Sequence, residues 1–379
     1  MAPANPNPKP ARGIIRRGGS RAPDAARAVA ELAGQLGASE LNAMVFFCAP
    51  SYDLEVLGRA VRERFGCPVA GCTTAGEILS PGGYLEHSLV GVGFATPEIS
   101  LETRFIPSLA DFAEGPDDFP ARPPAGPDDR RFGLLLIDGL SLLEERVAAK
   151  IHSRFRGGAL IGGSAGDYLE FRHAHVYHEG RFHERAASLA AFTTTLPFKA
   201  FQFQHFEPTE AKLVITEADV ATRTVSEING LPAAEEYARI VGVAADGLSP
   251  SVFAAHPVML RIGGDYYVRS IQKVNADGSL TFYCAIEAGL VLTLATSRSL
   301  PEQMKIQVEG LARELPDLQL ILGCDCILRR LELERRGESA RMAEVLAPYP
   351  FVGFSTFGEQ FGGLHVNQTL TGLAIGGPR

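Results

Sequence analysis

The chain has 379 residues, which at roughly 150 residues per domain predicts two domains or one large duplicated domain and excludes a small disulfide-stapled module. Hydrophobic residues make up 46% and charged residues 21% of the sequence, so the chain can bury a large core and is not disordered throughout. The formal net charge of −8 argues against nucleic acid as a partner.

The six cysteines lie mostly inside apolar runs, which is typical of buried reduced thiols rather than of a disulfide framework and favours the cytosol. No stretch approaches the roughly 18 uninterrupted apolar residues of a membrane-spanning helix, and the N-terminus lacks the apolar core of a secretion signal. We therefore expect a soluble cytoplasmic protein with no membrane partner.

Residues 1–23 combine five prolines with five basic residues and contain no acid. This composition predicts a disordered basic arm, and binding to a membrane surface or to a partner protein through its charge is the alternative interpretation. Residues 24–39, which follow the arm, are predicted to form an N-terminal helix.

A unit of strand, helix, strand, glycine-flanked turn and strand then occurs three times. The first copy has these elements at residues 44–47, 53–65, 68–70, 71–77 and 88–94. The second has them at 132–137, 142–155, 159–161, 162–167 and 187–193. The third has them at 318–322, 328–346, 351–352, 353–359 and 368–375. Strand, helix and strand within roughly 30 residues form a parallel crossover whose helix covers one sheet face. The sequence therefore predicts an α/β (α+β) fold of internally duplicated mixed sheets flanked by helices, in two subdomains.

The segments between the copies have a different character. Prolines and aspartates fill residues 107–131, which predicts a long surface loop. Residues 168–228 and 251–286 have the pattern of antiparallel strands joined by glycine-containing turns. A helix is predicted from Pro232 to Val241 and another at 301–315. We place the domain boundary before the first of these helices, which predicts an N-terminal domain at 40–231 and a C-terminal domain at 232–379.

The turns of the first and third copies match over seven positions, from Gly71 to Glu77 and from Gly353 to Glu359. Their glycines let a ligand approach the main chain, and their hydroxyls and N–H groups can donate to an anion. The two glutamates can accept from an ammonium group or a hydroxyl. The alternative is that these turns are structural connections whose carboxylates cap their own loops.

The turn of the second copy contains the pattern G-x-S-x-G around Ser164, which is found at the nucleophile of serine hydrolases. A nucleophile elbow needs a helix directly after the serine, whereas residues 167–177 have the alternation of a strand. We therefore favour a structural turn at Ser164 over a catalytic one.

Two further groups of residues are candidates for a binding site. His173, His175 and His183 lie close together in sequence, and the first two share one face of the predicted strand, which suits a metal or a haem. A half-exposed hairpin is the competing interpretation. Arg329 stands one helical turn after Cys326 and can bind a carboxylate with both nitrogens, although a surface ion pair explains it equally well.

Several ordered motifs together resemble the FIST family, whose two parts are called FIST N and FIST C. The motifs are Phe46-Phe47 with Tyr52-Asp53, Gly71–Ile78, Gly162–Asp167, Asn229-Gly230 with Ala233 and Tyr237, Cys326 with Arg329, Gly353–Glu359, and His365 with Asn367-Gln368-Thr369. The resemblance spans roughly residues 40 to 375, so the two predicted domains correspond to FIST N and FIST C.

The resemblance implies a sensory domain of signal transduction that binds small ligands such as amino acids, and some relatives bind haem and sense nitric oxide. We expect a non-catalytic protein without a cofactor that binds a small polar metabolite between its two halves. A haem-binding nitric oxide sensor using His173, His175 or His183 is the alternative. Since no kinase, cyclase or receptor segment is attached, the output is expected to pass to a separate protein such as a histidine kinase or a cyclase. The residues expected to line the ligand site are Cys72, Thr73, Thr74, Glu77, Ser164, Arg329, Thr356, Glu359, His365 and Asn367.

Overall fold

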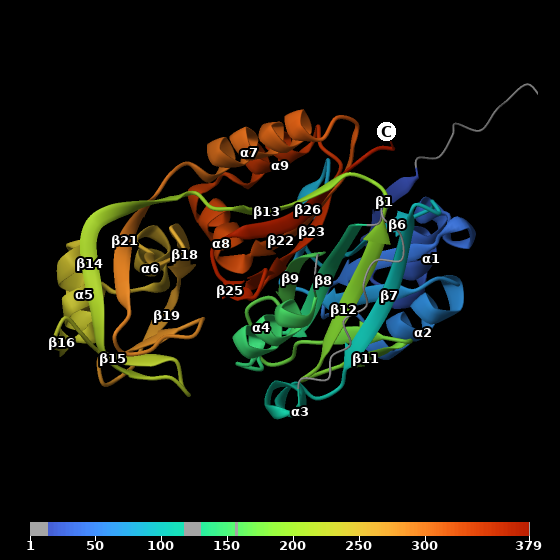
Figure 1. Ribbon diagram of the computed structural model, residues 1–379. Helices are drawn as coiled ribbons and strands as arrows, with labels where there is room; N and C mark the ends of the chain where they lie inside the picture. The colour runs from blue at the N-terminus through green and yellow to red at the C-terminus, as the bar shows by residue number, and fades with distance from the viewer. Residues whose placement is uncertain (1–13, 117–129, 156–157, 379) are drawn as a thin grey trace, which may run out of the picture.

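The computed structural model describes residues 14–116, 130–155 and 158–378, and their strands form four sheets (Figure 1). Three sheets have six strands each and together form one unit, here called the body. The fourth sheet, of eight strands, belongs to a smaller unit at residues 206–297, here called the inserted domain. The mixed α/β class predicted from the sequence is confirmed.

Each of the three body sheets is built on the predicted unit. The first copy comprises β1 (Ile15–Ser20), α1 (Ala25–Leu36), β2 (Ala43–Cys48), α2 (Leu54–Arg64), β3 (Val69–Thr73), β4 (Glu77–Leu79), β5 (Gly83–Leu85) and β6 (Leu89–Phe94). The second comprises β7 (Ile99–Ile106), α3 (Leu109–Glu114), β8 (Arg130–Asp138), α4 (Glu144–Arg154), β9 (Gly158–Ala165), β10 (Val176–His178), β11 (Arg181–His183) and β12 (Ala187–Thr194). The third comprises β13 (Phe198–Phe203), α7 (Leu300–Glu314), β22 (Leu318–Cys326), α8 (Ile327–Arg336), α9 (Ser339–Leu346), β23 (Phe351–Thr356), β24 (Glu359–Phe361), β25 (Leu364–Val366) and β26 (Leu370–Gly376).

The local sequence explains these elements. In the first copy, Asp53 caps α2 by accepting a hydrogen bond from the backbone N–H of Val56 at 3.0 Å. Strand β2 is buried on both faces, because Val45 and Phe47 face the core shared by the sheets while Met44 and Phe46 face the helices. Because both faces of β2 are covered, its sequence is an unbroken run of apolar residues.

The three copies exchange their hairpins in a cycle. After its turn, each copy sends two short strands to the sheet of another copy: β4–β5 pairs with β23, β10–β11 with β3, and β24–β25 with β9. Each sheet therefore contains strands of two copies. This exchange brings the three turns together at the centre of the body.

Backbone hydrogen bonds join the turns to one another. Ala75 donates to the carbonyl of Ser355 at 2.9 Å, and Ser355 donates to that of Gly76 at 2.7 Å. Ser164 donates to the carbonyl of Gly358 at 2.8 Å. The expected structural equivalence of the turns at 71–77 and 353–359 is confirmed, and the repetition is threefold.

The inserted domain lies between β13 and α7, so it interrupts the third copy (Figure 1, yellow to orange, at the left). It comprises β14 (Phe206–Asp219), β15 (Thr224–Ile228), β16 (Leu231–Pro232), α5 (Ala233–Val241), α6 (Pro250–Ala255), β17 (Val258–Ile262), β18 (Asp265–Arg269), β19 (Ile271–Val274), β20 (Leu280–Phe282) and β21 (Val291–Ser297). It has its own apolar core around Leu213, Ile215 and Tyr237. The predicted boundary at 231/232 lies at β16 of this domain, directly after the turn at Asn229-Gly230.

Several predicted elements differ from the observed ones. Within the predicted disordered arm, residues 15–20 form β1, which pairs with β6 and buries Ile15; residues 1–13 lie outside the described part of the chain. The predicted helix 328–346 is two helices, because Gly337 adopts a φ of 67° that ends α8. The predicted loop 107–131 contains α3 and the start of β8, and 251–286 begins in α6; residues 117–129 are not among those described.

Candidate functional site

The glutamates of the first and third turns form matching buried caps. In the first turn, Glu77 accepts hydrogen bonds from the hydroxyl of Thr74 at 2.5 Å and from that of Ser88 at 2.6 Å. In the third turn, Glu359 accepts from the hydroxyls of Thr356 and Thr369. Burial raises the pKa of Glu77 to about 7 and that of Glu359 to about 8, against the lowering effect of these hydrogen bonds.

The remaining residues of the turns are also engaged within the body. Thr73 accepts from the backbone N–H of His175 at 3.0 Å, and Cys72 is fully buried with its pKa raised well above its usual value by burial. In the second copy, Asp167 caps its own loop by accepting from three successive backbone N–H groups, those of residues 171–173. The carboxylates of Glu77 and Glu359 thus accept hydrogen bonds from their own loops, as the capping interpretation expects.

Ser164 lies inside β9 and not on an elbow before a helix. Its side chain is fully buried, and its Oγ accepts a hydrogen bond from Nε2 of Gln360 at 3.0 Å. Gln360 also contacts Nδ1 of His365 at 3.2 Å, so an amide stands between the serine and the imidazole. This arrangement does not supply the direct histidine contact that serine hydrolysis requires.

Arg329 is buried in an ionic network at the start of α8. Its Nε donates to Asp325 at 2.6 Å, and the same carboxylate accepts from the hydroxyl of Tyr84 at 2.5 Å. Its Nη1 approaches Nδ1 of His205, which contacts Glu332 at 2.8 Å through Nε2. The predicted surface ion pair is wrong, because the side chain of Arg329 is 2% exposed and holds parts of the body together.

The histidine cluster does not have the surroundings of a haem. Residues 167–175 form no strand, so His173 and His175 do not share a strand face as predicted; both instead approach Oε1 of Glu184, at 2.7 and 3.4 Å. His183 packs against the ring of Phe105 at 4.6 Å. A haem needs an apolar wall wide enough for the macrocycle, and these imidazoles face a carboxylate or a single ring. The residues present do not fit the group.

A cavity of ≈ 260 Å³ lies where the body meets the inserted domain. It is lined by Gly139, Leu140, Leu142, Glu144, Phe171, Thr222, Arg223, Gln272, Thr281, Phe282, Tyr283, Phe357 and His365. Of the ten residues predicted to bind ligand, His365 is the one that lines this junction cavity. The other lining residues come from loops and strands of both units.

Charged side chains from both units meet at the junction cavity. Arg223 of the inserted domain donates through Nη2 to Glu144 at 2.9 Å and to Glu145 at 2.6 Å, both in the first turn of α4. Burial opposes the charge on Arg223, yet the two carboxylates raise its pKa above the usual value. Burial also lowers the pKa of His365, so this imidazole is neutral at neutral pH.

Asn367 lies beside His365 but hydrogen-bonds to nothing among the described residues. Its side chain is fully buried, and neither its amide nitrogen nor its oxygen has a partner there. A Cβ atom on Gly358 would come within 2.2 Å of His365 and 3.1 Å of Asn367, so the glycine is required for their packing. A buried amide without partners is unusual and costs free energy.

Sequence reasoning missed Glu144, Arg223, Phe171 and Phe357 as lining residues. Three residues of the cavity wall, Leu142, Phe171 and Arg223, have positive φ values of 59°, 54° and 53°. Such conformations are costly for side chains larger than glycine and tend to occur at functional sites. No sequence motif marks them, because they depend on loop conformations that only the folded chain has.

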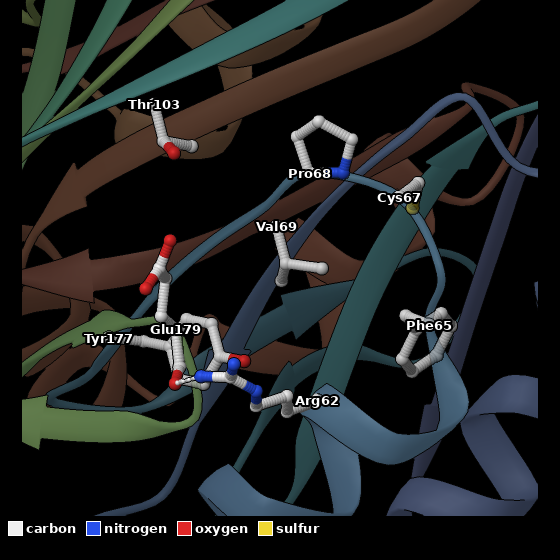
Figure 2. A pocket seen from close by; sticks show the side chains of 8 residues that line it. All are labelled: Arg62, Phe65, Cys67, Pro68, Val69, Thr103, Tyr177 and Glu179. Carbon is white, nitrogen blue, oxygen red and sulfur yellow. Dashed lines mark hydrogen bonds between the residues drawn. The ribbon is translucent and has the colours of Figure 1, made fainter.

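A cavity of ≈ 280 Å³ on the body, shown in Figure 2, lies between the end of α2 and the β10–β11 hairpin. Arg62 and Glu179 are exposed at its edge, and the guanidinium donates to the carbonyl oxygen of Glu179 at 2.6 Å. Burial raises the pKa of Cys67 in its wall to about 11, so this thiol is weakly reactive. The junction cavity, with its buried charges, is the better candidate site.

Among the described residues, no group of three or more histidine, cysteine, aspartate or glutamate side chains is arranged to hold a metal ion. No helix in the same residues has both the length and the apolar character needed to cross a membrane.

Comparison with protein families covers most of the chain. The model of the FIST N domain matches residues 42–231, and that of the FIST C domain matches residues 233–362. The two matches meet inside the inserted domain, at β16. A search of curated proteins finds no match.

Proposed function

Because the chain belongs to the FIST family, whose domains are sensory domains of signal transduction proteins, we propose that it is a non-catalytic sensor of a small polar metabolite. The proposed ligand site is the junction cavity, and an α-amino acid is the proposed ligand. This places the site between the two structural units rather than at the central turns, and it needs no cofactor.

The observation that carries the proposal is the meeting of buried opposite charges at one cavity. Glu144 and His365 come from the body and Arg223 from the inserted domain, and all three are at most 5% exposed. Buried charges are costly unless they are paired or used in binding. Ligand sites are typically concave, with a few convergent polar groups in a mostly apolar wall, and this cavity has that composition.

The position of the cavity gives a physical route to an output. A ligand that touches both units changes the free energy of their relative placement, provided that it binds one placement better than another. The two covalent connections of the inserted domain, near His205 and Arg298, are joined by a backbone hydrogen bond of 2.8 Å, so they lie side by side. Closure about such a narrow connection is a common sensory response.

A thermal-shift screen of the standard amino acids and of dicarboxylates tests the proposal. A ligand present at 100 times its dissociation constant adds about 2.7 kcal/mol to the free energy of unfolding. We expect a rise in the melting temperature of the wild type with at least one amino acid. The Gln272→Trp variant, which fills the junction cavity, should lose this rise.

Lys273→Trp is the matched control, because Lys273 is the exposed neighbour of Gln272 and does not line the cavity. It should keep the ligand-dependent rise. The absence of a shift with every compound, or a shift that survives Gln272→Trp, would contradict the proposed site.

We also propose that a separate signalling protein, such as a histidine kinase or a cyclase, receives the output. The sensory character of the family supports this partner class. Affinity purification of the full chain with and without the ligand found in the screen, followed by mass spectrometry, tests it. A kinase or cyclase recovered in only one of the two states is expected.

A further inference from the structure

The wall of the junction cavity divides into a polar group and an apolar group. In the polar group, Arg223 is ion-paired with Glu144, and His365 lines the same wall. In the apolar group, the rings of Phe171 and Phe357 stack with centroids 4.6 Å apart, and Leu140 packs against Phe357. A ligand that fills the cavity therefore meets both kinds of surface.

The polar group has both a hydrogen-bond acceptor and hydrogen-bond donors that are free to bind a ligand. Among the described residues, Oε1 of Glu144 has no partner, and Nε2 of His365 has none either. With Gln360 donating to Nδ1, the proton of the neutral imidazole lies on Nε2. Arg223 makes three hydrogen bonds, whereas a guanidinium has five N–H groups. One acceptor and several donors match an ammonium group and a carboxylate on one molecule.

The apolar group is partly exposed and strained. Leu142 is 54% and Phe171 is 38% exposed, although both are large apolar residues held at positive φ. Both conformations are costly for residues other than glycine, and the apolar surface that the two side chains expose to water gains no free energy from burial. An apolar group of a ligand would cover this surface, which gives these conformations a function.

From these observations we infer that the junction cavity selects α-amino acids with an apolar side chain, aromatic or branched. The ammonium group lies at Glu144, the carboxylate at Arg223 and His365, and the side chain against Leu142, Phe171 and Phe357. The volume of ≈ 260 Å³ is just below the range of roughly 300 to 1,000 Å³ for drug-sized ligands, so a single amino acid fits better than a peptide. This inference rests on the proposed function, which does not specify the side chain of the amino acid.

Isothermal titration calorimetry of the full chain with chosen amino acids tests the inference. We expect L-phenylalanine and L-leucine to bind at least tenfold more tightly than L-aspartate, L-lysine and L-serine. Phenethylamine and 3-phenylpropionate, which lack the carboxylate and the ammonium group respectively, should each bind at least tenfold more weakly than L-phenylalanine.

A pair of variants on one loop separates side-chain recognition from stability. Phe171→Ser should weaken L-phenylalanine binding at least fivefold, whereas Leu169→Ser should not, because Leu169 is exposed on the same loop but does not line the cavity. Tight binding of polar amino acids alone, or L-phenylalanine binding unchanged by Phe171→Ser, would overturn the inference and leave the proposed function standing. If no amino acid binds at all, both fall.

Discussion

At the scale of single residues, the central turns show how buried carboxylates can serve a fold. Glu77 and Glu359 are fully buried, and each satisfies hydroxyl and N–H groups that its own loop would otherwise leave unpaired. Burial disfavours the charged form of these acids, the hydrogen bonds from threonines and serines favour it, and burial is the larger effect. The raised pKa values of both groups follow from this burial.

This burial predicts a pH dependence of stability. The folded-state pKa of Glu359, about 8, is above its unfolded value of 4.5, so the folded state retains a proton that the unfolded state releases. The free energy of unfolding therefore falls as the pH rises from about 4.5 to 8 and then levels. Glu359→Gln should reduce this slope by about 1.4 kcal/mol per pH unit, measured by urea unfolding at several pH values. An unchanged slope in Glu359→Gln would show that Glu359 ionises normally in the folded protein.

Ser164 gives a second prediction at this scale. Its buried hydroxyl contacts an amide rather than an imidazole, so it lacks the base that activates a serine nucleophile. We expect no labelling of the protein by a fluorophosphonate probe under conditions that label a known serine hydrolase. Labelling that disappears in Ser164→Ala would establish a catalytic serine.

At the scale of elements, the exchanged hairpins depend on side chains of the receiving copy. Arg330 of α8 donates to the carbonyl of Leu85 at 3.2 Å and to Glu86 at 2.6 Å, and so holds the β4–β5 hairpin in the third sheet. A Cβ atom on Gly76 would lie 1.7 Å from this guanidinium, so the glycine of the first turn makes room for it. Packing against Arg330 thus explains why the motif has a glycine at this position.

Arg330→Met should destabilise the protein by about 2 to 3 kcal/mol, because it leaves buried carbonyl groups without a donor. Chemical denaturation at constant pH measures the effect. The control Arg341→Met removes an exposed ion pair with Glu302 and should cost less than about 0.5 kcal/mol. Equal effects of the two substitutions would mean that the hairpin is held in place by its strand pairing alone.

The segment before β10 gives the element-scale prediction for haem. Since Glu184 engages His173 and His175, and neither lies on a strand face, we expect no Soret band in protein purified from haem-supplemented cells. The visible spectrum measures this directly. A strong Soret band that is lost on substituting His173, His175 or His183 would contradict the observed arrangement.

At the scale of the whole molecule, Arg223 joins the inserted domain to the body at the junction cavity, alongside hydrogen bonds from Arg269 to the carbonyl of His365 and from Ser270 to Gln368. Removing one partner of a buried ion pair leaves an uncompensated charge, which typically costs about 3 to 5 kcal/mol. Arg223→Met should therefore destabilise the protein and increase proteolysis at the connections near His205 and Arg298. The double variant Arg223→Met/Glu144→Gln should recover part of the stability, because the buried charge is then removed as well. Full stability in the single variant would show that the ion pair does not hold the units together.

Much of the local structure follows from residues that are neighbours in the chain. The apolar strand runs and the glycine-flanked turns recur in three copies, and these features and the Asp53 cap of α2 depend on residues close together in the chain. Local sequence also gave one wrong prediction. Residues 167–177 have the alternating pattern of a strand, but Asp167 accepts hydrogen bonds from three successive backbone N–H groups and so holds the start of this segment in a loop. The sequence also offered the interpretation that the turn carboxylates cap their own loops, because such caps likewise involve residues close together in the chain.

How the copies combine and where a ligand site lies depend on contacts that form only in the folded chain. The cyclic exchange of hairpins cannot be predicted from three similar copies, because the sequence of a short strand does not specify which copy it pairs with. The junction cavity unites Glu144, Arg223 and His365, which lie far apart in sequence on two folded units. Their proximity follows from the insertion of one domain into the third copy, and the strained loops of the cavity wall exist only after that packing has formed.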